Sequence, residues 1–290
     1  MENEIDQRNL LVPYNGTPIV RWLVLQRICP NRKAASSPHI IAKVRINASP
    51  VESLSQLVQE TDIVEYDGRV VTCRVEGHVH YIMNKPSGCL SSRRNMHQLK
   101  GGIVIVDPRP SVYDYIPPDH RSHVNSIGRL DFDTTGLLLF TSDGMLQHAL
   151  ATPKFKVDKI YSCTLRSPGP LSDEAIAQLQ EGVQLPHAKG AIVRGKAWNV
   201  PSDNTNHNNV VELCIQGGYT HQVKLMLKLV HRPLRLLHRR TFANLELPPD
   251  LGPGECRPML PEEIDHLYCL AKQQMELERE EVISQMRSTE

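Results

Sequence analysis

Residues 128–144 have the sequence GRLDFDTTGLLLFTSDG, in which a polar segment rich in turn-forming residues leads into an apolar run. The apolar run predicts a buried strand, and the DTTG segment before it predicts a turn. Asp131 therefore lies on an irregular loop beside a core strand, which holds a carboxylate stiffly yet leaves it open to solvent, as a nucleophile or general base requires. Asp131 and Asp133 fit equally well as turn residues that bond their own backbone, so the residues alone leave both interpretations open.

The segments on either side predict an α+β fold. Strands are expected at 81–83, Lys159–Leu165, 190–198 and Val210–Ile215, and a turn is expected at 84–88. Ser172 can cap a helix that places Ile176, Leu179 and Val183 on one face and has Gly182 near its end. The Asn-rich segment 199–209 is expected to be a surface loop.

A helix is also predicted at 221–230, because its apolar and basic residues separate onto different faces. The apolar residues follow the helical repeat i, i+3, i+4, i+7 and are Val223, Met226, Leu227 and Val230. His221, Lys224 and Lys228 line another side. This helix therefore presents basic groups from a rigid support.

The N-terminal segment has a different pattern. Residues 1–17 are polar and are expected to form a flexible arm. A helix is predicted at 19–28, a second short helix is predicted from Arg32 and limited by Pro38, and strands are predicted at 44–47 and 63–68.

The charge is balanced overall and uneven along the chain. In 290 residues there are 33 Lys and Arg and 32 Asp and Glu, a formal net charge of +1, which argues against a histone-like or tail-driven nucleic-acid binder. Residues 18–50 and 224–240 nevertheless contain no acid, and each such stretch is either a phosphate-binding face or a solvated basic face. Acids dominate the last segment, where a helix is predicted at Pro261–Arg287.

Several classes of protein and site are not expected. No apolar run approaches the roughly 20 residues of a membrane span, and no secretory signal is visible, so we expect an intracellular protein with no membrane partner. The seven cysteines are scattered without a CxxC pair, which favours free thiols in a reducing compartment over a disulfide framework or a metal site.

Taken together, these segments resemble RNA pseudouridine synthases of the RsuA-like family. The motifs that carry the resemblance are, in chain order, YIMNKPSG at 81–88, GRLDFDTTGLLLFTSDG at 128–144, KIY at 159–161, GYTHQVK at 218–224, LHR at 237–239 and LGPGECRP at 251–258. The last motif is most similar to the small-subunit ribosomal RNA branch. The N-terminal order of helix, helix, strand, strand resembles an S4 RNA-binding domain.

The family resemblance implies roles for individual residues. Asp131 matches the essential aspartate, which attacks the ribose or removes a ribose proton so that uracil detaches, rotates and rejoins through carbon. Tyr161 matches the tyrosine that packs on the target base and takes part in proton handling, and Lys224 matches the basic residue that pairs with the aspartate. The residues expected to contact RNA are Arg32, Lys33, Lys43, Lys85, Arg129, His221 and Arg239.

The resemblance also implies an architecture and partners. We expect a flexible arm (1–17), an S4-like α/β module (18–75), an α+β catalytic domain with a mixed, largely antiparallel sheet and a central RNA cleft (78–268), and an acidic C-terminal helix (269–290). The implied substrate is ribosomal RNA, above all that of the small subunit, free or in a preribosomal particle. The implied reaction uses neither cofactor nor metal.

Three further expectations follow from the same resemblance. The free protein is expected to be a monomer, and its compartment is the cytoplasm or an organelle with its own ribosomes. The alternative to an active enzyme is a family member that has lost catalysis and serves as an RNA-binding ribosome assembly factor.

Overall fold

The computed structural model describes residues 17–26, 28–29, 32–59, 62–71, 78–93, 96–98, 104–152, 155–186, 190–201 and 209–287. The chain divides into two compact units. The first comprises Met1–His78, Asp143–Leu146 and Ala271–Glu290, and the second comprises Val79–Ser142 and Gln147–Leu270. The predicted N-terminal arm, apart from Thr17, lies outside the described residues.

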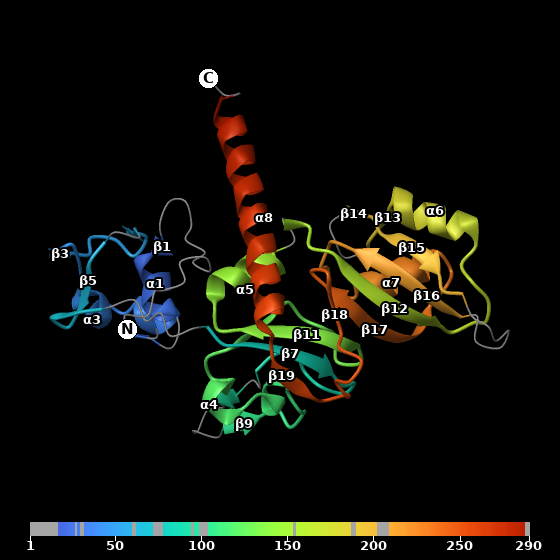
Figure 1. Ribbon diagram of the computed structural model, residues 1–290, viewed down its shortest axis with the longest axis horizontal. Coiled ribbons are helices and arrows are strands. Elements are labelled where there is room, and N and C mark those ends of the chain that lie inside the picture. The colour runs from blue at the N-terminus through green and yellow to red at the C-terminus, as the bar shows by residue number, and fades with distance from the viewer. Residues whose placement is uncertain are drawn as a thin grey trace. The chain divides into compact units, whose positions relative to one another are not determined.

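The N-terminal part of the first unit is a small arrangement of helices and strands (Figure 1). Its elements are β1 (Thr17–Pro18), α1 (Ile19–Leu25), α2 (Arg32–Ala35), α3 (Pro38–Ile41), β2 (Val44–Ile46), β3 (Ser49–Pro50), β4 (Leu57–Val58), β5 (Val64–Tyr66) and β6 (Arg69–Val70). Four strands form an antiparallel sheet in the order β3-β2-β5-β6, and β1 pairs with β4.

The apolar spacing of this segment explains its core. α1 buries Ile19, Trp22 and Leu23 in one cluster with Val44 and other strand residues. Pro38 occupies the first turn of α3, because a proline is tolerated there but prevents the preceding residue from continuing a helix. The predicted helix from Arg32 therefore ends early, as expected, and a separate helix follows. The S4-like identity of this part stays a prediction.

The second unit is built on a nine-stranded sheet. The strands of this unit are β7 (His80–Lys85), β8 (Met96–Gln98), β9 (Val104–Val106), β10 (Asn125–Ile127), β11 (Thr135–Thr141), β12 (Lys159–Leu165), β13 (Val183–Gln184), β14 (Ile192–Val193), β15 (Lys196–Asn199), β16 (Val210–Ile215), β17 (Leu234–Phe242), β18 (Leu245–Glu246) and β19 (Cys256–Pro258). The main path through the sheet is β15-β16-β12-β17-β11-β7-β19, with β10 beside β11 and β18 beside β17. β13 pairs with β14 and β8 with β9, outside this sheet.

The pairing of the strands confirms the predicted α+β fold class. β11 and β17 are parallel, whereas the other recorded pairs of this sheet are antiparallel. The sheet is therefore mixed and largely antiparallel. The remaining elements are a 3-10 helix (Val112–Tyr115), α4 (Pro118–Arg121), α5 (Gly144–Ala151), α6 (Asp173–Glu181), α7 (Gln222–Leu229) and α8 (Pro261–Arg287).

The strand predicted from the GLLLF sequence is β11, near the centre of the sheet. Its residues Leu137, Leu138, Leu139 and Phe140 are all fully buried. Because successive side chains of a strand point to opposite faces, both faces of β11 are covered. The loop that carries Asp131 therefore leads directly into a strand in which every residue after Thr135 is buried.

The two predicted helices of this unit are confirmed. Ser172 caps α6 by accepting a hydrogen bond from the Ala175 amide, and Gly182 follows its last turn. α7 buries Met226 and Leu227 in the hydrophobic core that they share with residues of the sheet. The strand predicted at 190–198 is instead two strands, β14 and β15, and most of the loop predicted at 199–209 lies outside the described residues.

α8 has the limits that its sequence predicts, Pro261–Arg287. Leu267 and Ala271 are buried, as expected from their spacing, and Ile264 is half-buried. Among the described helices, none combines the length and the apolar character that crossing a lipid bilayer needs.

Candidate active site

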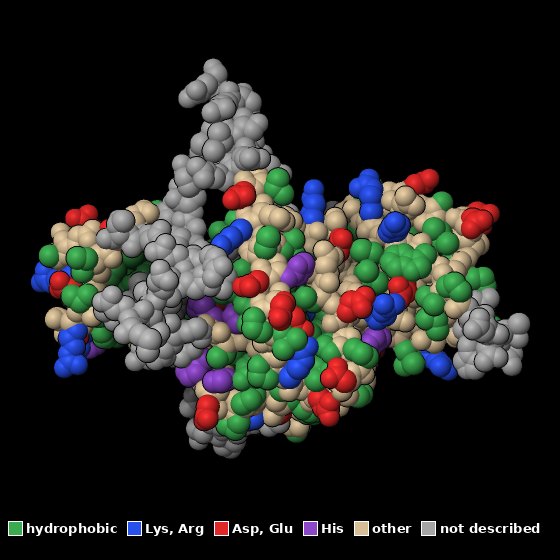
Figure 2. All heavy atoms as spheres, in the orientation of Figure 1, with side chains coloured by type: hydrophobic (Ala, Val, Ile, Leu, Met, Phe, Trp, Pro, Cys, Tyr) green, Lys and Arg blue, Asp and Glu red, His purple; other side chains and the backbone are tan. Residues whose placement is uncertain are grey.

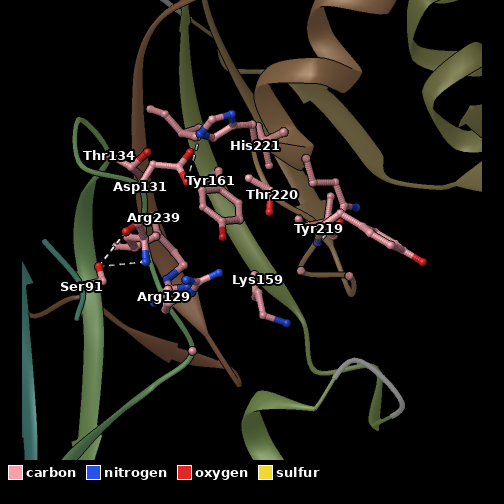
Figure 3. Close-up of a pocket in the computed structure, with 18 of the residues that line it drawn as sticks. Ser91, Arg129, Asp131, Thr134, Lys159, Tyr161, Tyr219, Thr220, His221 and Arg239 are labelled. Atoms are coloured by element: carbon pink, nitrogen blue, oxygen red, sulfur yellow. Dashed lines mark hydrogen bonds and ion pairs between the residues drawn. The ribbon is translucent and has the colours of Figure 1, made fainter. Parts of the chain in front are cut away.

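A pocket of about 500 Å³ lies in the second unit (Figure 3). Its walls come from the loop at 128–134, from β12 and β17, and from the segment at 215–223. Ligand pockets in proteins commonly have volumes of about 300–1,000 Å³, so this one can accommodate a single nucleotide. Asp131, Tyr161 and His221, which are far apart in the sequence, all line it.

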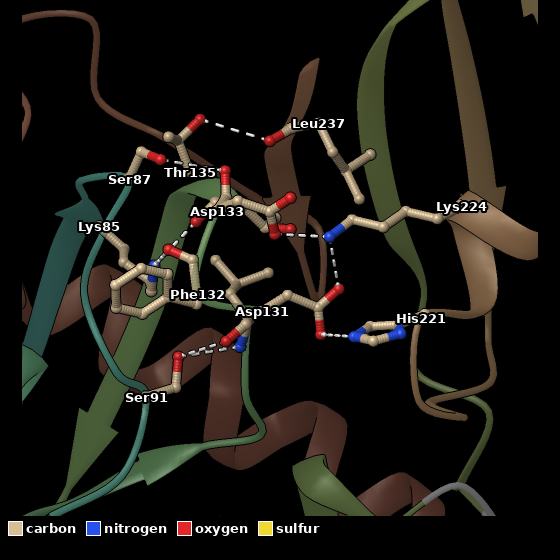
Figure 4. A network of polar contacts seen from close by, with 12 residues as sticks. Lys85, Ser87, Ser91, Asp131, Phe132, Asp133, Thr135, His221, Lys224 and Leu237 are labelled. Carbon is tan, nitrogen blue, oxygen red and sulfur yellow. Dashed lines mark hydrogen bonds and ion pairs between the residues drawn. The ribbon is translucent and has the colours of Figure 1, made fainter. Parts of the chain in front are cut away.

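The loop that carries Asp131 is held by Lys85, the last residue of β7. The Lys85 side chain is fully buried, and its Nζ donates hydrogen bonds to the carbonyl oxygens of Pro86 (2.9 Å), Phe132 (3.3 Å) and Thr134 (2.9 Å) (Figure 4). Burial lowers the pKa of Lys85. The Lys85 ammonium group is therefore enclosed and fixes the loop through three carbonyl groups, and its contact with RNA stays a prediction.

Two further contacts fix both ends of this loop. Ser91 Oγ donates to the carbonyl oxygen of Leu130 (2.6 Å) and accepts from its amide (3.1 Å). At the other end, Gly136 has a φ of +103° and lies so close to the backbone of Arg239 that a Cβ atom would overlap its carbonyl oxygen. Asp131 is thus mounted between two constrained points of the backbone, which limits the motion of its carboxylate.

The Asp131 carboxylate faces two basic side chains of the α7 region. Lys224 Nζ lies 3.1 Å from Asp131 Oδ2 and 2.5 Å from Asp133 Oδ1, and His221 Nε2 lies 3.8 Å from Asp131 Oδ1 (Figure 4). His221 directly precedes α7 and has a left-handed backbone, with φ of 56°. Asp131 therefore forms an ion pair with Lys224 and lies close to His221, whereas Asp133 also accepts a hydrogen bond from its own backbone.

The ion pairs change the acidity of the groups around Lys224. The hydrogen bond from Lys224 lowers the pKa of Asp133, although partial burial acts in the opposite direction. Burial also opposes the charge of Lys224, but hydrogen bonds to Asp133 and Asp131 outweigh it, so the pKa of Lys224 is raised. Lys224 is therefore a cation at neutral pH, and a cation at this distance favours the ionised form of a carboxylate.

Tyr161 is the aromatic wall of the pocket. It belongs to β12, its register partners are Arg239 on β17 and Leu213 on β16, and it is only 7% exposed. Figure 3 places its ring next to Asp131. The structure therefore brings together the aspartate, the tyrosine and, through Asp131, the lysine that the sequence singled out.

The two arginines predicted to contact RNA differ in exposure. Arg129 is exposed and lines the pocket, in keeping with a position that RNA can reach. Arg239 is only 1% exposed, and its Nε donates to the carbonyl oxygen of Leu137. Arg239 is therefore part of the pocket wall, and the prediction holds for it only if the contact is made inside the pocket.

Residues 224–240, which contain no acid, do not form one basic face. Arg232 donates to backbone carbonyl groups, and Lys224 binds two aspartates. Arg239 and Arg240 are neighbours on β17 and point to opposite faces, so Arg239 is buried while Arg240 pairs with Glu212. On the face of the molecule that Figure 2 shows, basic side chains are interspersed with acidic ones.

The three residues predicted to bind RNA in the first unit lie near its surface. Arg32 and Lys33 are exposed on α2. Lys43 is half-buried, and its Nζ lies 3.4 Å from Asp67. Their contact with RNA stays a prediction.

The structure adds Lys159 to the pocket, a residue to which the sequence assigned no role. It lies two positions before Tyr161 on β12, and residues i and i+2 of a strand share a face. The spacing of two residues between Lys159 and Tyr161 is the sequence signal that places Lys159 in the pocket. Among the described residues, no three His, Cys, Asp or Glu side chains are grouped so that they could hold a metal ion.

Comparisons with known proteins place this fold and site in a family. The model of the RNA pseudouridylate synthase family matches residues 79–229. Ribosomal small subunit pseudouridine synthase A of Yersinia pestis is 34% identical over 224 residues, which cover 77% of this chain and 86% of that protein. Ribosomal large subunit pseudouridine synthase B of Bacillus subtilis (strain 168) is 31% identical over 229 residues, which cover 79% and 86%.

A solved structure agrees with these relatives. A crystal structure of a pseudouridylate synthase matches with a TM-score of 0.59 and 28% sequence identity, covering 86% of this chain and 98% of that one. The chain therefore belongs to the RNA pseudouridine synthase family, whose members isomerise uridine in RNA. Its relatives place it among the RsuA-like members of that family.

Proposed function

We propose that this chain converts one uridine of structured small-subunit ribosomal RNA to pseudouridine, with Asp131 as the catalytic group. The observation that carries the proposal is the Asp131 carboxylate, 3.1 Å from the Lys224 ammonium and in the same pocket as Tyr161. Several relatives at 30–34% identity are named for the small ribosomal subunit, which supports that substrate.

The chemistry of the reaction explains the need for a fixed carboxylate. Breaking the bond between N1 of uracil and C1′ of ribose builds positive, oxocarbenium-like character on the sugar, and an ionised carboxylate either traps or stabilises that charge. Asp131 attacks C1′ or removes the proton at C2′. Lys224 forms an ion pair with Asp131, and the loop contacts of Lys85 and Ser91 keep Asp131 in place.

The detached uracil then rotates, and its C5 forms the new bond to C1′. The proton on C5 leaves and N1 gains one, so the atoms of substrate and product balance and no oxidant or reductant is consumed. Tyr161, which lines the pocket, forms a wall against which the base stacks, and its hydroxyl takes part in this proton transfer.

The target nucleotide must leave its helix before it can react. A base cannot rotate inside a stack, and enzymes that act on bases therefore flip the nucleotide into a pocket. Arg129 is exposed at this pocket and is suited to hold the flanking backbone. The S4-like part binds RNA elsewhere along its backbone, through Arg32, Lys33 and Lys43. The protein acts as a monomer. Its compartment is the cytoplasm or an organelle with its own ribosomes.

Mapping pseudouridines in both ribosomal RNAs tests this proposal. Small- and large-subunit RNA, each free and in assembly intermediates, are incubated with the purified protein and compared with untreated RNA. The proposal predicts one new pseudouridine in the small-subunit RNA. A new site in large-subunit RNA alone contradicts the substrate, and binding without any new pseudouridine supports a catalytically inactive assembly factor instead.

A further inference from the structure

Three cationic side chains of the pocket have no acidic partner. Arg129, Lys159 and Arg239 all line it, and none of them is joined by an ion pair to an Asp or Glu within the part of the chain that the structure describes. Figure 3 draws Arg129 and Lys159 on one side of the Tyr161 ring and Asp131 on the other. The pocket therefore has a basic region apart from its carboxylate.

Arg239 carries an unused hydrogen-bond donor. Its Nε donates to Leu137 O at 2.8 Å, and its Cζ lies 5.0 Å from the centroid of the Phe242 ring. Its Nη2 is buried and has no hydrogen-bond partner. A guanidinium N–H that is removed from water and left unpaired is costly and rare in folded proteins, and each such group calls for an explanation. One explanation is that a bound ligand supplies the hydrogen-bond acceptor for Arg239 Nη2.

Lys159 stands beside the same aromatic ring. Its Nζ lies 5.5 Å from the Phe242 centroid and donates to the carbonyl oxygens of Val157 (2.9 Å) and Gln216 (3.4 Å). Burial, followed by repulsion from Arg239, lowers the pKa of Lys159 to about 8. The attraction of Asp158 does not outweigh this repulsion, and an anion bound between the basic groups reduces it.

We infer that Arg129, Lys159 and Arg239 form a subsite for the phosphate group that adjoins the reacting uridine. The inference rests on the proposed function, because RNA supplies a phosphodiester on each side of every ribose. Guanidinium groups suit phosphate oxygens in both charge and geometry, and a lysine adds a compact positive charge. The phosphate held in this way fixes the ribose relative to Asp131.

Binding of small probes to the purified full-length protein tests the subsite. The probes are uridine 5′-monophosphate, uridine 3′-monophosphate, uridine and inorganic phosphate, and the dissociation constant of each is measured at pH 7. Lys159→Met removes the ammonium group and keeps the length of the side chain. Arg129→Gln is a second variant whose exposed position leaves folding unaffected. Lys196→Met, on the exposed side of β15 and outside the pocket, is the matched control.

The subsite predicts that at least one uridine monophosphate binds more tightly than uridine. Loss of one charged hydrogen bond then weakens monophosphate binding by about 10-fold or more in Lys159→Met and Arg129→Gln, with uridine binding unchanged. Lys196→Met behaves as the wild type. Equal affinity for uridine and its monophosphates, no saturable monophosphate binding at millimolar concentration, or equal losses in Lys159→Met and Lys196→Met overturn the inference.

The catalytic proposal can fail separately from the subsite. Asp131→Asn leaves the three cations in place, removes a negative charge from the pocket, and is expected to bind the monophosphates at least as tightly as the wild type does. Phosphate-dependent binding in a protein that forms no pseudouridine in any RNA keeps the subsite and rejects the proposed reaction.

Discussion

Lys159 imposes a cost on folding that substitution can remove. At pH 7 its ammonium group is charged in a largely buried place without an acid partner, and its pKa is about 8 instead of 10.5. Since each pKa unit corresponds to 1.36 kcal/mol, holding the proton in the folded state costs about 3 kcal/mol. Lys159→Met removes this cost.

The substitution also removes two hydrogen bonds, to Val157 and Gln216. A typical hydrogen bond contributes about 1 kcal/mol, so the two losses together offset about half of the gain or somewhat more. We therefore expect Lys159→Met to be more stable than the wild type by about 1–2 kcal/mol at pH 7.

The pH dependence isolates the effect of Lys159. Its pKa is lower in the folded protein than in the unfolded chain, so between pH 8 and 10.5 the unfolded chain binds the proton and the folded protein does not. The free energy of unfolding of the wild type therefore rises with pH across this window. Lys159→Met lacks this rise, and its advantage over the wild type shrinks as the pH increases from 8.

Urea unfolding at pH values from 7 to 10 measures both quantities, as long as unfolding is reversible. Lys196→Met, which alters an exposed lysine, is the control and is expected to differ from the wild type by a small amount that does not change across the window. A Lys159→Met protein that is less stable than the wild type by 2 kcal/mol or more at pH 7, or a difference that does not vary with pH, would refute the reasoning.

Two further predictions concern RNA affinity and packing. Replacing Arg32, Lys33 and Lys43 together by Gln is expected to flatten the salt dependence of RNA binding, by a slope of roughly 0.7 per lost contact if the site behaves like single-stranded RNA; an unchanged slope means that this surface does not touch phosphate. Gly136→Ala is expected to destabilise the protein by more than about 3 kcal/mol in urea unfolding, because its φ is +103° and the new Cβ would overlap the backbone of Arg239. A loss below 1 kcal/mol would show that the β11–β17 pair has room to adjust.

The sequence predicts the features of this protein that depend on local spacing. The apolar run of β11, the capped helix α6 and the two faces of α7 follow from periodicity and capping, which act within a few residues. Asp131, Tyr161 and Lys224 were assigned from motifs whose spatial meeting only the fold reveals.

The features that the sequence does not predict depend on long-range contacts. The burial of Lys85 and Arg239 could not be predicted either, because a charged residue is expected at the surface, yet each is buried against carbonyl groups of another part of the chain. The strand predicted at 190–198 divides near Gly195, where a Cβ atom would lie 2.8 Å from the side chain of Leu213. No local sequence pattern around these residues predicts their contact partners.

The most direct test of the account is pseudouridine formation by Asp131→Asn. This substitution keeps the size of the side chain and removes the carboxylate charge, and Asp119→Asn, on exposed α4 and outside the pocket, is the matched control. Pseudouridine is mapped in small-subunit ribosomal RNA after incubation with each protein, and RNA binding is measured in parallel. The account predicts no product from Asp131→Asn with nearly unchanged RNA binding, and wild-type product from Asp119→Asn. Product formation by Asp131→Asn at a rate near that of the wild type would contradict it.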